Sequence, residues 1–162
     1  MIPILITGAN GQLGSEIRRK AGNYPGMSFH FTDIEELDIC DAKAVSDYLD
    51  SNPVKFIVNC AAYTAVDQAE NEAEKAMAIN AGAADILAGE SDRRKIQLIH
   101  ISTDYVFDGE NNRPYRENDP VSPQTIYGKT KLAGEWPGST PELMKAWSRR
   151  PIISIPLNKD RD

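Results

Sequence analysis

Residues 4–14 read Ile-Leu-Ile-Thr-Gly-Ala-Asn-Gly-Gln-Leu-Gly, so a short apolar run passes directly into a turn that contains three glycines. A helical pattern follows over residues 15–21. A buried strand, a glycine-rich turn and a helix are typical of the first unit of a dinucleotide-binding fold, because the helix N-terminus offers free N–H groups and a positive dipole end to phosphate. The spacing of Gly8, Gly11 and Gly14 differs from the Gly-x-Gly-x-x-Gly form, so a glycine-rich turn without a ligand stays open as an alternative.

The rest of the chain alternates between strand and helix patterns. We expect strands at residues 28–32, 56–60 and 97–101, helices at 42–50 and 72–89, and a short fifth strand at 152–155 as a weaker candidate. This alternation predicts the α/β class, with a Rossmann-type, doubly wound, mostly parallel sheet.

Residues at the ends of the second and third strands are candidates for cofactor contacts. Asp33 follows the second strand, nineteen residues beyond Gly14. Its carboxylate can accept hydrogen bonds from ribose hydroxyls, which favours NAD over NADP; an ordinary strand-ending aspartate is the alternative. Residues 61–67, most of which are small, follow the third strand and leave room for a flat cofactor, although close packing of strand on helix would also select them.

Tyr127 and Lys131 lie four residues apart, and Ser122 followed by Pro123 predicts the start of a helix that carries both. An ammonium held one turn from a phenol lowers the pKa of the phenol from its usual value of about 10. Tyr127 is therefore a candidate general acid or base. A surface tyrosine beside a solvated lysine is the alternative.

Three further features are placed by the pattern of strands and helices. Asn80 interrupts the apolar stripe of the helix at 72–89, and because a buried amide must be hydrogen-bonded, we expect it to brace a neighbouring strand. The hydroxyls of Ser102 and Thr103 follow the fourth strand and should face the cofactor crevice. We expect the irregular loop at 110–123 to form one wall of the substrate site.

The composition limits the kinds of partner. With 41% hydrophobic residues, 26% charged residues and a net charge of -6, the chain is typical of a soluble globular protein and is a poor candidate for nucleic-acid binding. No apolar run approaches the ~20 residues that span a bilayer, and the N-terminus does not resemble a signal peptide. Cys40 and Cys60 match no metal-ligand spacing and are interpreted as reduced thiols, so we expect a cytoplasmic protein.

Four segments together resemble a known family. They are the turn at 8–14, Asn-Cys-Ala-Ala-Tyr-Thr-Ala-Val-Asp at 59–67, Ser-Thr-Asp-Tyr-Val-Phe-Asp-Gly at 102–109 and Tyr-Gly-Lys-Thr-Lys at 127–131. In this order they resemble the extended short-chain dehydrogenases, and within them the dTDP-4-dehydrorhamnose reductases. The resemblance covers residues 1 to about 135.

The resemblance implies that NADPH or NADH reduces the C4 ketone of a dTDP-linked deoxy-ketosugar, dTDP-4-dehydro-L-rhamnose, to dTDP-L-rhamnose. It implies that Tyr127 protonates the developing alkoxide, that Lys131 lowers the pKa of this tyrosine and holds the nicotinamide ribose, and that Thr103 supplies the triad hydroxyl. Asp104, with Thr103, would hold the sugar. Together with Asp33, Tyr127 and Lys131, the cofactor-binding residues that it implies are Gly8, Asn10, Gly11, Gln12, Leu13, Gly14, Asp38, Ile39, Ala61, Ala62, Tyr63 and Thr64. By resemblance alone, Mg²⁺ is a possible metal and a homodimer a possible assembly.

The resemblance stops after Glu135. Pro137 ends the helix early, and residues 137–162 hold four of the ten prolines and a formal charge of +2, from five basic and three acidic residues. We therefore expect residues 1–136 to form an NAD(P)-binding Rossmann domain, residues 137–162 to be a tail foreign to the family, frame-shifted or disordered, and the C-terminal substrate domain to be missing. A non-catalytic, cofactor-binding regulatory module and an inactive truncated fragment are the alternatives to an active reductase.

Overall fold

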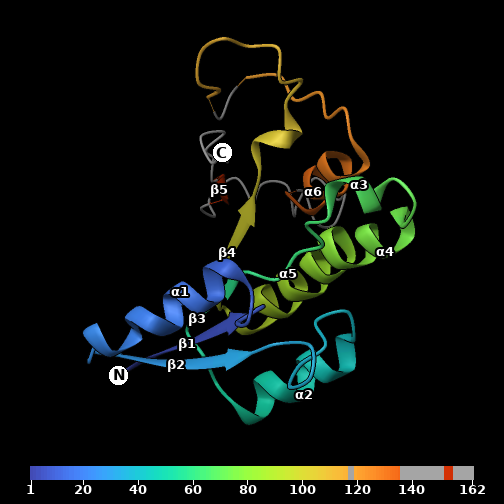
Figure 1. Cartoon of the computed structure of the whole chain (residues 1–162). Coiled ribbons are helices and arrows are strands. Elements are labelled where there is room, and N and C mark those ends of the chain that lie inside the picture. The colour runs from blue at the N-terminus through green and yellow to red at the C-terminus, as the bar shows by residue number, and fades with distance from the viewer. Residues whose placement is uncertain (117–118, 136–151, 155–162) are drawn as a thin grey trace.

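The computed structural model describes residues 1–116, 119–135 and 152–154 of the 162-residue chain. A parallel sheet with the strand order β2-β1-β3-β4-β5 forms its centre (Figure 1). The strands are β1 (Ile2–Thr7), β2 (Met27–Thr32), β3 (Phe56–Asn59), β4 (Gln97–Ser102) and β5 (Ile152–Ser154). The prediction of a Rossmann-type parallel sheet is confirmed, and the weaker candidate for a fifth strand is present, one residue shorter than expected.

β5 pairs in parallel with β4, with Ile153 opposite Ile101. It lies within residues 137–162, so that segment contributes one strand to the sheet. The other residues of the segment lie outside the described part of the chain, and the expectations about its origin stay predictions.

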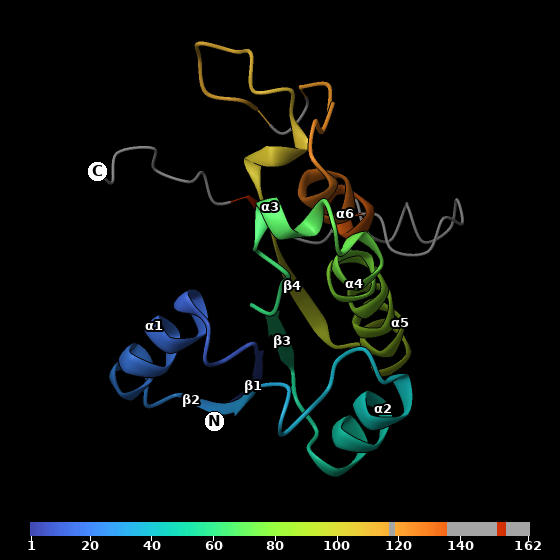
Figure 2. The same ribbon diagram turned by 45° about the vertical axis from the view of Figure 1, so that its right-hand side comes forward.

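Helices cover both faces of the sheet. Figure 2 shows α1 on one side and α2, α4, α5 and α6 on the other. The helices are α1 (Gln12–Lys20), α2 (Ala42–Ser51), α3 (Val66–Ala69), α4 (Ala73–Met77), α5 (Ala83–Arg94) and α6 (Ile126–Glu135), with short helices η1 (Ala21–Asn23), η2 (Ala78–Gly82) and η3 (Asp104–Val106). Apolar side chains of β1, β3 and β4 pack against those of α2 and α5, and Leu5, Ile57 and Leu87 are fully buried.

The expected helix at 72–89 is longer and is interrupted in its middle. It runs through α4, η2 and α5, from Ala73 to Arg94, and η2 is a π-helical turn. A π turn inserts an extra residue into the helix and shifts the side chains around it. The insertion falls at Asn80, whose side chain is buried.

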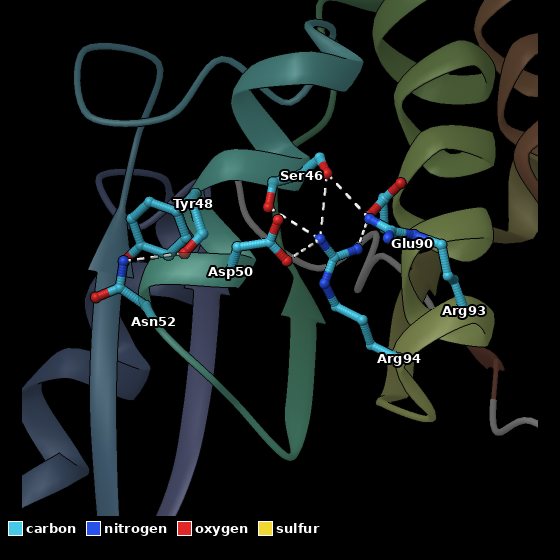
Figure 3. Close-up of polar contacts among 7 residues, drawn as sticks. All are labelled: Ser46, Tyr48, Asp50, Asn52, Glu90, Arg93 and Arg94. Atoms are coloured by element: carbon cyan, nitrogen blue, oxygen red, sulfur yellow. Dashed lines mark hydrogen bonds and ion pairs between the residues drawn. The ribbon is translucent and has the colours of Figure 1, made fainter.

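A polar cluster joins α2 to α5 (Figure 3). The Arg94 guanidinium donates to an Asp50 carboxylate oxygen at 2.5 Å and to the backbone oxygen and hydroxyl of Ser46 at 3.0 and 3.1 Å, and it forms an ion pair with Glu90. Its side chain is 14% exposed, whereas that of the neighbouring Arg93 is 57% exposed. Arg94 therefore links the two helices through partly dehydrated charges.

We expect Arg94→Met to lower the free energy of unfolding by about 1–3 kcal/mol, because it leaves Asp50 and the Ser46 carbonyl without their charged donor and leaves Glu90 paired with Arg93 alone. The matched control Arg93→Met removes a more exposed guanidinium and should cost less than ~1 kcal/mol. Urea unfolding followed by circular dichroism measures both. Equal losses in the two variants would contradict a special role for Arg94.

Candidate cofactor and catalytic site

The glycine turn brings backbone atoms closer together than any side chain would permit. Gly8 has φ +64°, and a Cβ there would lie 2.5 Å from the Ala61 Cα. A Cβ on Gly14 would lie 2.4 Å from the Gly8 carbonyl oxygen, so this glycine lets α1 pack on the turn. Gly11 precedes α1, and among the described residues no side chain caps this helix. The first N–H groups of α1 are therefore available to an anion.

Helix α1 begins at Gln12, three residues earlier than the sequence predicted. The amide of Ser15 donates to the carbonyl of Gly11, four residues earlier, at 2.9 Å, which is the hydrogen bond of a first helical turn. Gln12 and Leu13 thus belong to the first turn of the helix, where phosphate-binding N–H groups are found.

Two adjoining cavities follow the carboxyl ends of the strands. The first, of about 300 Å³, reaches from Gly8 to the loop after β2; of the residues expected to bind cofactor, it is lined by Gly8, Gly11, Asp33, Asp38, Ile39, Ala61 and Ala62. The second, of about 380 Å³, is lined by Gly11, Gln12, Leu13, Ala61, Ala62, Thr64, Thr103, Tyr127 and Lys131. Because the two share the glycine turn and the alanines after β3, they form a continuous path that suits a dinucleotide.

Four of the expected residues do not line these cavities. Gly14 packs against the turn, and Asn10 donates its backbone N–H to Asp33 at 2.8 Å. The Tyr63 side chain lies in a second apolar cluster with Ala69, Ala76 and Tyr127, and its hydroxyl donates to Glu72 at 3.1 Å. Asp104 begins η3, where its Oδ1 accepts from the Thr103 hydroxyl at 3.3 Å.

Asp33 has a structural role as well as its place in the first cavity. Its Oδ2 accepts the Asn10 amide, and its Oδ1 accepts the Ile34 amide at 2.9 Å. Its own amide donates to Glu36 at 2.8 Å. A carboxylate has about four acceptor positions, so Asp33 can fix the glycine turn and still accept a hydrogen bond from a ligand.

The residues expected to be catalytic meet in the second cavity, and all are buried: Thr103 is 3% exposed, Tyr127 7% and Lys131 2%. Tyr127 packs edge-on against Tyr105, with ring centroids 5.4 Å apart. Burial raises the pKa of Tyr127, and its hydrogen bond to Thr103 partly opposes that rise. The tyrosine is therefore held in its protonated form at neutral pH.

The prediction that Lys131 lowers the pKa of Tyr127 is wrong, because the pKa of Tyr127 is raised. Lys131 Nζ donates instead to the Ile101 carbonyl at the end of β4, at 2.5 Å. Burial lowers the pKa of Lys131 to about 8, and Glu135 opposes that shift. The prediction considered only the attraction between an ammonium and a phenolate, whereas burial disfavours the charged form of each group.

The start of α6 also differs from the prediction. The helix begins at Ile126, because Ser122 donates its amide to Val106 and its hydroxyl accepts from the Gln124 side chain. The capping hydroxyl belongs to Thr125, which accepts the Gly128 amide at 3.0 Å. The Glu70 carboxylate accepts the Ile126 amide at 2.8 Å, so a second carboxylate oxygen from outside the helix caps its first turn.

Asn80 is buried and hydrogen-bonded, as the sequence predicted, but it braces the segment after β3 and helix α6 and not a strand. Its Oδ1 accepts the Tyr63 amide at 2.8 Å, and its Nδ2 donates to the Tyr63 carbonyl at 3.1 Å and to the Thr130 hydroxyl at 3.0 Å. It thereby joins the segment after β3 to α6 without lining either cavity.

Sequence reasoning missed two glycines on α6 that set its position. A Cβ on Gly128 would lie 2.3 Å from the Tyr105 carbonyl oxygen, and one on Gly134 would lie 2.1 Å from that of Asn80. Glycine at two positions of one helix, six residues apart, was the available signal of close backbone packing.

Other expectations about the site stay predictions. In the described residues no group of three or more His, Cys, Asp or Glu side chains could hold a metal ion, and Mg²⁺ stays an expectation from the resemblance. Described residues of the 110–123 loop do not line the two cavities. No helix in the described part of the chain is long and apolar enough to cross a membrane.

The fold and the two cavities together define a dinucleotide-binding domain with a buried Tyr-x-x-x-Lys pair. Residues 2–137 match the model of the RmlD substrate binding domain, and the chain belongs to this family. The chain spans about half the length of the curated relatives it matches.

Several proteins of known name are similar in sequence to most of this chain. The spore coat polysaccharide biosynthesis protein SpsK of Bacillus subtilis is 44% identical over 83% of this chain and 47% of its own length. A dTDP-4-dehydrorhamnose reductase of Aggregatibacter actinomycetemcomitans is 41% identical over 83% of this chain and 46% of its own. The crystal structure of dTDP-4-dehydrorhamnose reductase from Bacillus anthracis in complex with NADP is 35% identical, has a TM-score of 0.85, and matches 96% of this chain and 54% of that one.

We expect Gly134→Ala to lower the free energy of unfolding by about 1–3 kcal/mol, because its methyl group would overlap the Asn80 carbonyl oxygen and push α6 away. Gly89→Ala on α5 is the matched control, since nothing lies within 4 Å of its added Cβ. That control should raise the same free energy by ~0.5–1 kcal/mol through helix propensity. Urea unfolding gives both values, and a stabilised Gly134→Ala would contradict the close packing of α6.

Proposed function

We propose that this chain is the cofactor-binding part of a reductase that uses NADH or NADPH to reduce the C4 ketone of dTDP-4-dehydro-L-rhamnose. One observation carries the proposal: Thr103, Tyr127 and Lys131 line a cavity that continues into the one beside the glycine turn. The relatives named dTDP-4-dehydrorhamnose reductase support the reaction, and the relative bound to NADP supports the cofactor.

The residues present fit a dinucleotide. The N–H groups at the start of α1, at Gln12 and Leu13, would hold the pyrophosphate, and Asp33 would accept a ribose hydroxyl. Asp38 and Ile39 would lie beside the adenine, and the small residues after β3 beside the nicotinamide. When bound, the reduced cofactor supplies a hydride to the carbonyl carbon of the sugar.

The chain's own residues would donate the proton and stabilise the negative charge on the sugar oxygen. Hydride addition leaves negative charge on the sugar oxygen, and a nearby proton donor stabilises that charge. Tyr127 is protonated at neutral pH because burial raises its pKa, so it can donate. Thr103 lines the same cavity, and its hydroxyl is hydrogen-bonded with Tyr127. The Lys131 ammonium would supply positive charge beside the developing anion.

The relatives do not favour a non-catalytic regulatory module, since those named above for an activity are reductases. NADH should bind more tightly than NADPH, because the Asp33 carboxylate would face the 2′-phosphate of NADPH. The proposal also includes a homodimer and a cytoplasmic location.

The function is tested by titrating the purified chain with NADH, following Tm and the fluorescence of bound NADH, and then adding dTDP-4-dehydro-L-rhamnose. Ligand that binds the folded state raises Tm. Binding with turnover is the expected result. Binding without turnover would favour the regulatory module, and a chain that does neither would contradict the proposal.

We expect Tyr127→Phe to lower kcat by about 10²–10⁴-fold, because the variant keeps the ring in place and removes the proton donor. The Kd for NADH should change less than about twofold. The exposed Tyr24 provides the control, and Tyr24→Phe should leave kcat unchanged. Steady-state oxidation of NADH measures the effect, and a Tyr127→Phe variant with full kcat would remove Tyr127 from the proposed mechanism.

The cofactor preference is tested by Asp33→Asn, which removes a negative charge and keeps an acceptor oxygen. We expect the ratio of the NADPH and NADH dissociation constants to fall by about tenfold, equivalent to ~1.4 kcal/mol of repulsion removed. Glu35→Gln, at an exposed site two residues away, removes the same charge and should leave the ratio unchanged. A ratio that stays the same in Asp33→Asn would show that Asp33 only fixes the glycine turn.

A further inference from the structure

Two side chains of α6 contact consecutive residues at the end of β4. Lys131 Nζ donates to the Ile101 carbonyl at 2.5 Å, and the Ser102 hydroxyl donates to Glu135 Oε1. Lys131 and Glu135 are four residues apart and so lie on the same side of the helix. The next residue of the chain is Thr103, so this double contact fixes α6 directly beside the triad hydroxyl.

Glu135 is a half-buried carboxylate that the proposed reaction does not otherwise use. Burial raises its pKa, while the Ser102 hydrogen bond and the Lys131 charge lower it again. In turn, Glu135 is the group that raises the pKa of Lys131 against the effect of burial. The two charges therefore support each other in a region where either alone would tend to become neutral.

Within the described part of the chain, few other charges act on Lys131 from the elements packed around α6. From β4, His100 is buried and its pKa falls to about 3, so it is neutral. Asp104 of η3 acts on Tyr127, and Glu70 caps Ile126 at the opposite end of the helix. The buried side chains on α3, α4, η2 and α5 are uncharged: Ala69, Ala76, Asn80, Ala83, Ala84, Leu87, Ala88 and Ser91.

We propose that Glu135 is a positioning residue of the reductase site, which keeps the Lys131 ammonium charged and, through Ser102, holds it against the end of β4. The proposal rests on the proposed function for its consequence in turnover, but its electrostatic part does not. Glu135 does not line either cavity, so it acts through Lys131 and not on a ligand.

A purely structural hydrogen bond between helix and strand is the competing explanation, and two variants separate it from the proposal. Glu135→Gln keeps the length of the side chain and an oxygen that accepts from Ser102, but removes the negative charge. Ser102→Ala removes the hydrogen bond and keeps the charge. A structural role predicts that Ser102→Ala shifts the pKa of Lys131 more than Glu135→Gln does. The proposed role predicts the larger shift for Glu135→Gln.

The direct measurement is the titration of Lys131 by NMR in chain labelled with ¹³C at lysine Cε, with the resonance assigned by its loss in Lys131→Arg. We expect a midpoint near pH 8 in the unchanged chain. In Glu135→Gln it should fall by about one pH unit, because a buried ammonium loses its opposite charge. In Ser102→Ala it should fall by less than half of that amount.

Turnover gives the second readout. If Lys131 must be charged, kcat/KM declines as the pH rises through the Lys131 pKa, and this decline should move to lower pH in Glu135→Gln by the same amount as the NMR midpoint. If Glu135→Gln does not fold, Glu135→Asp, which keeps the charge but withdraws it by one methylene, should move the midpoint down by a smaller step.

An unchanged Lys131 midpoint in Glu135→Gln would overturn the proposal, as would equal midpoints in Glu135→Gln and Ser102→Ala. The titration needs no turnover, so it decides the role of Glu135 even if the chain does not reduce the ketosugar. In that case the proposed function fails and the electrostatic link between Glu135 and Lys131 is still tested.

Discussion

The buried amide of Asn80 connects three parts of the chain that lie far apart in the sequence. It satisfies both backbone groups of Tyr63 and donates to Thr130, so its acceptor and both of its donor hydrogens are used. An uncharged amide makes these bonds without the desolvation cost that a carboxylate would meet in the same place. The wall after β3 and the helix that carries Tyr127 are therefore held in one arrangement, and the position of the second cavity depends on it. The π turn η2 is where this amide lies.

A second set of buried polar groups crosses the sheet below the cavities. Asn59 Oδ1 accepts from the Thr7 hydroxyl at 2.7 Å and from the Ala61 amide at 3.1 Å, and its Nδ2 lies 3.1 Å from His100 Nδ1. Since the amide nitrogen can only donate, His100 accepts at Nδ1 and is neutral, in agreement with its low pKa. A neutral imidazole can lie near Lys131 without repelling it. The same bonds fix Ala61, whose backbone touches the glycine turn.

The sequence predicted those features that rest on local patterns. The apolar run before Gly8, the alternation of strands and helices and the buried Asn80 each follow from residues close together in the chain, and the structure confirms them. The start of α6 was wrong because Ser122 looks like a cap in isolation, whereas contacts with Val106 and Gln124 occupy it. The pKa of Tyr127 was predicted in the wrong direction for a related reason: its burial depends on residues more than 50 positions away, in the apolar cluster with Tyr63, Ala69 and Ala76. Close approaches such as that of Gly134 to Asn80 are likewise tertiary and leave only an unexplained glycine in the sequence.

Burial acts on the two central side chains in opposite senses, and this limits how the site can work. It raises the pKa of Tyr127, so the proton needed by an alkoxide stays on the phenol, but it lowers that of Lys131 to about 8 and weakens the cation that would stabilise the product anion. A more exposed site would keep the lysine charged and would solvate the anion with water instead of fixed groups, losing the benefit of preorganisation. A buried site must instead provide negative charge or aligned dipoles beside the ammonium. The Ile101 carbonyl supplies such a dipole at 2.5 Å. Because Ile101 is the second-last residue of β4, the electrostatics of the site depend on where α6 meets the end of this strand. The contact between the two elements is therefore as much a part of the chemistry as the side chains that line the cavity.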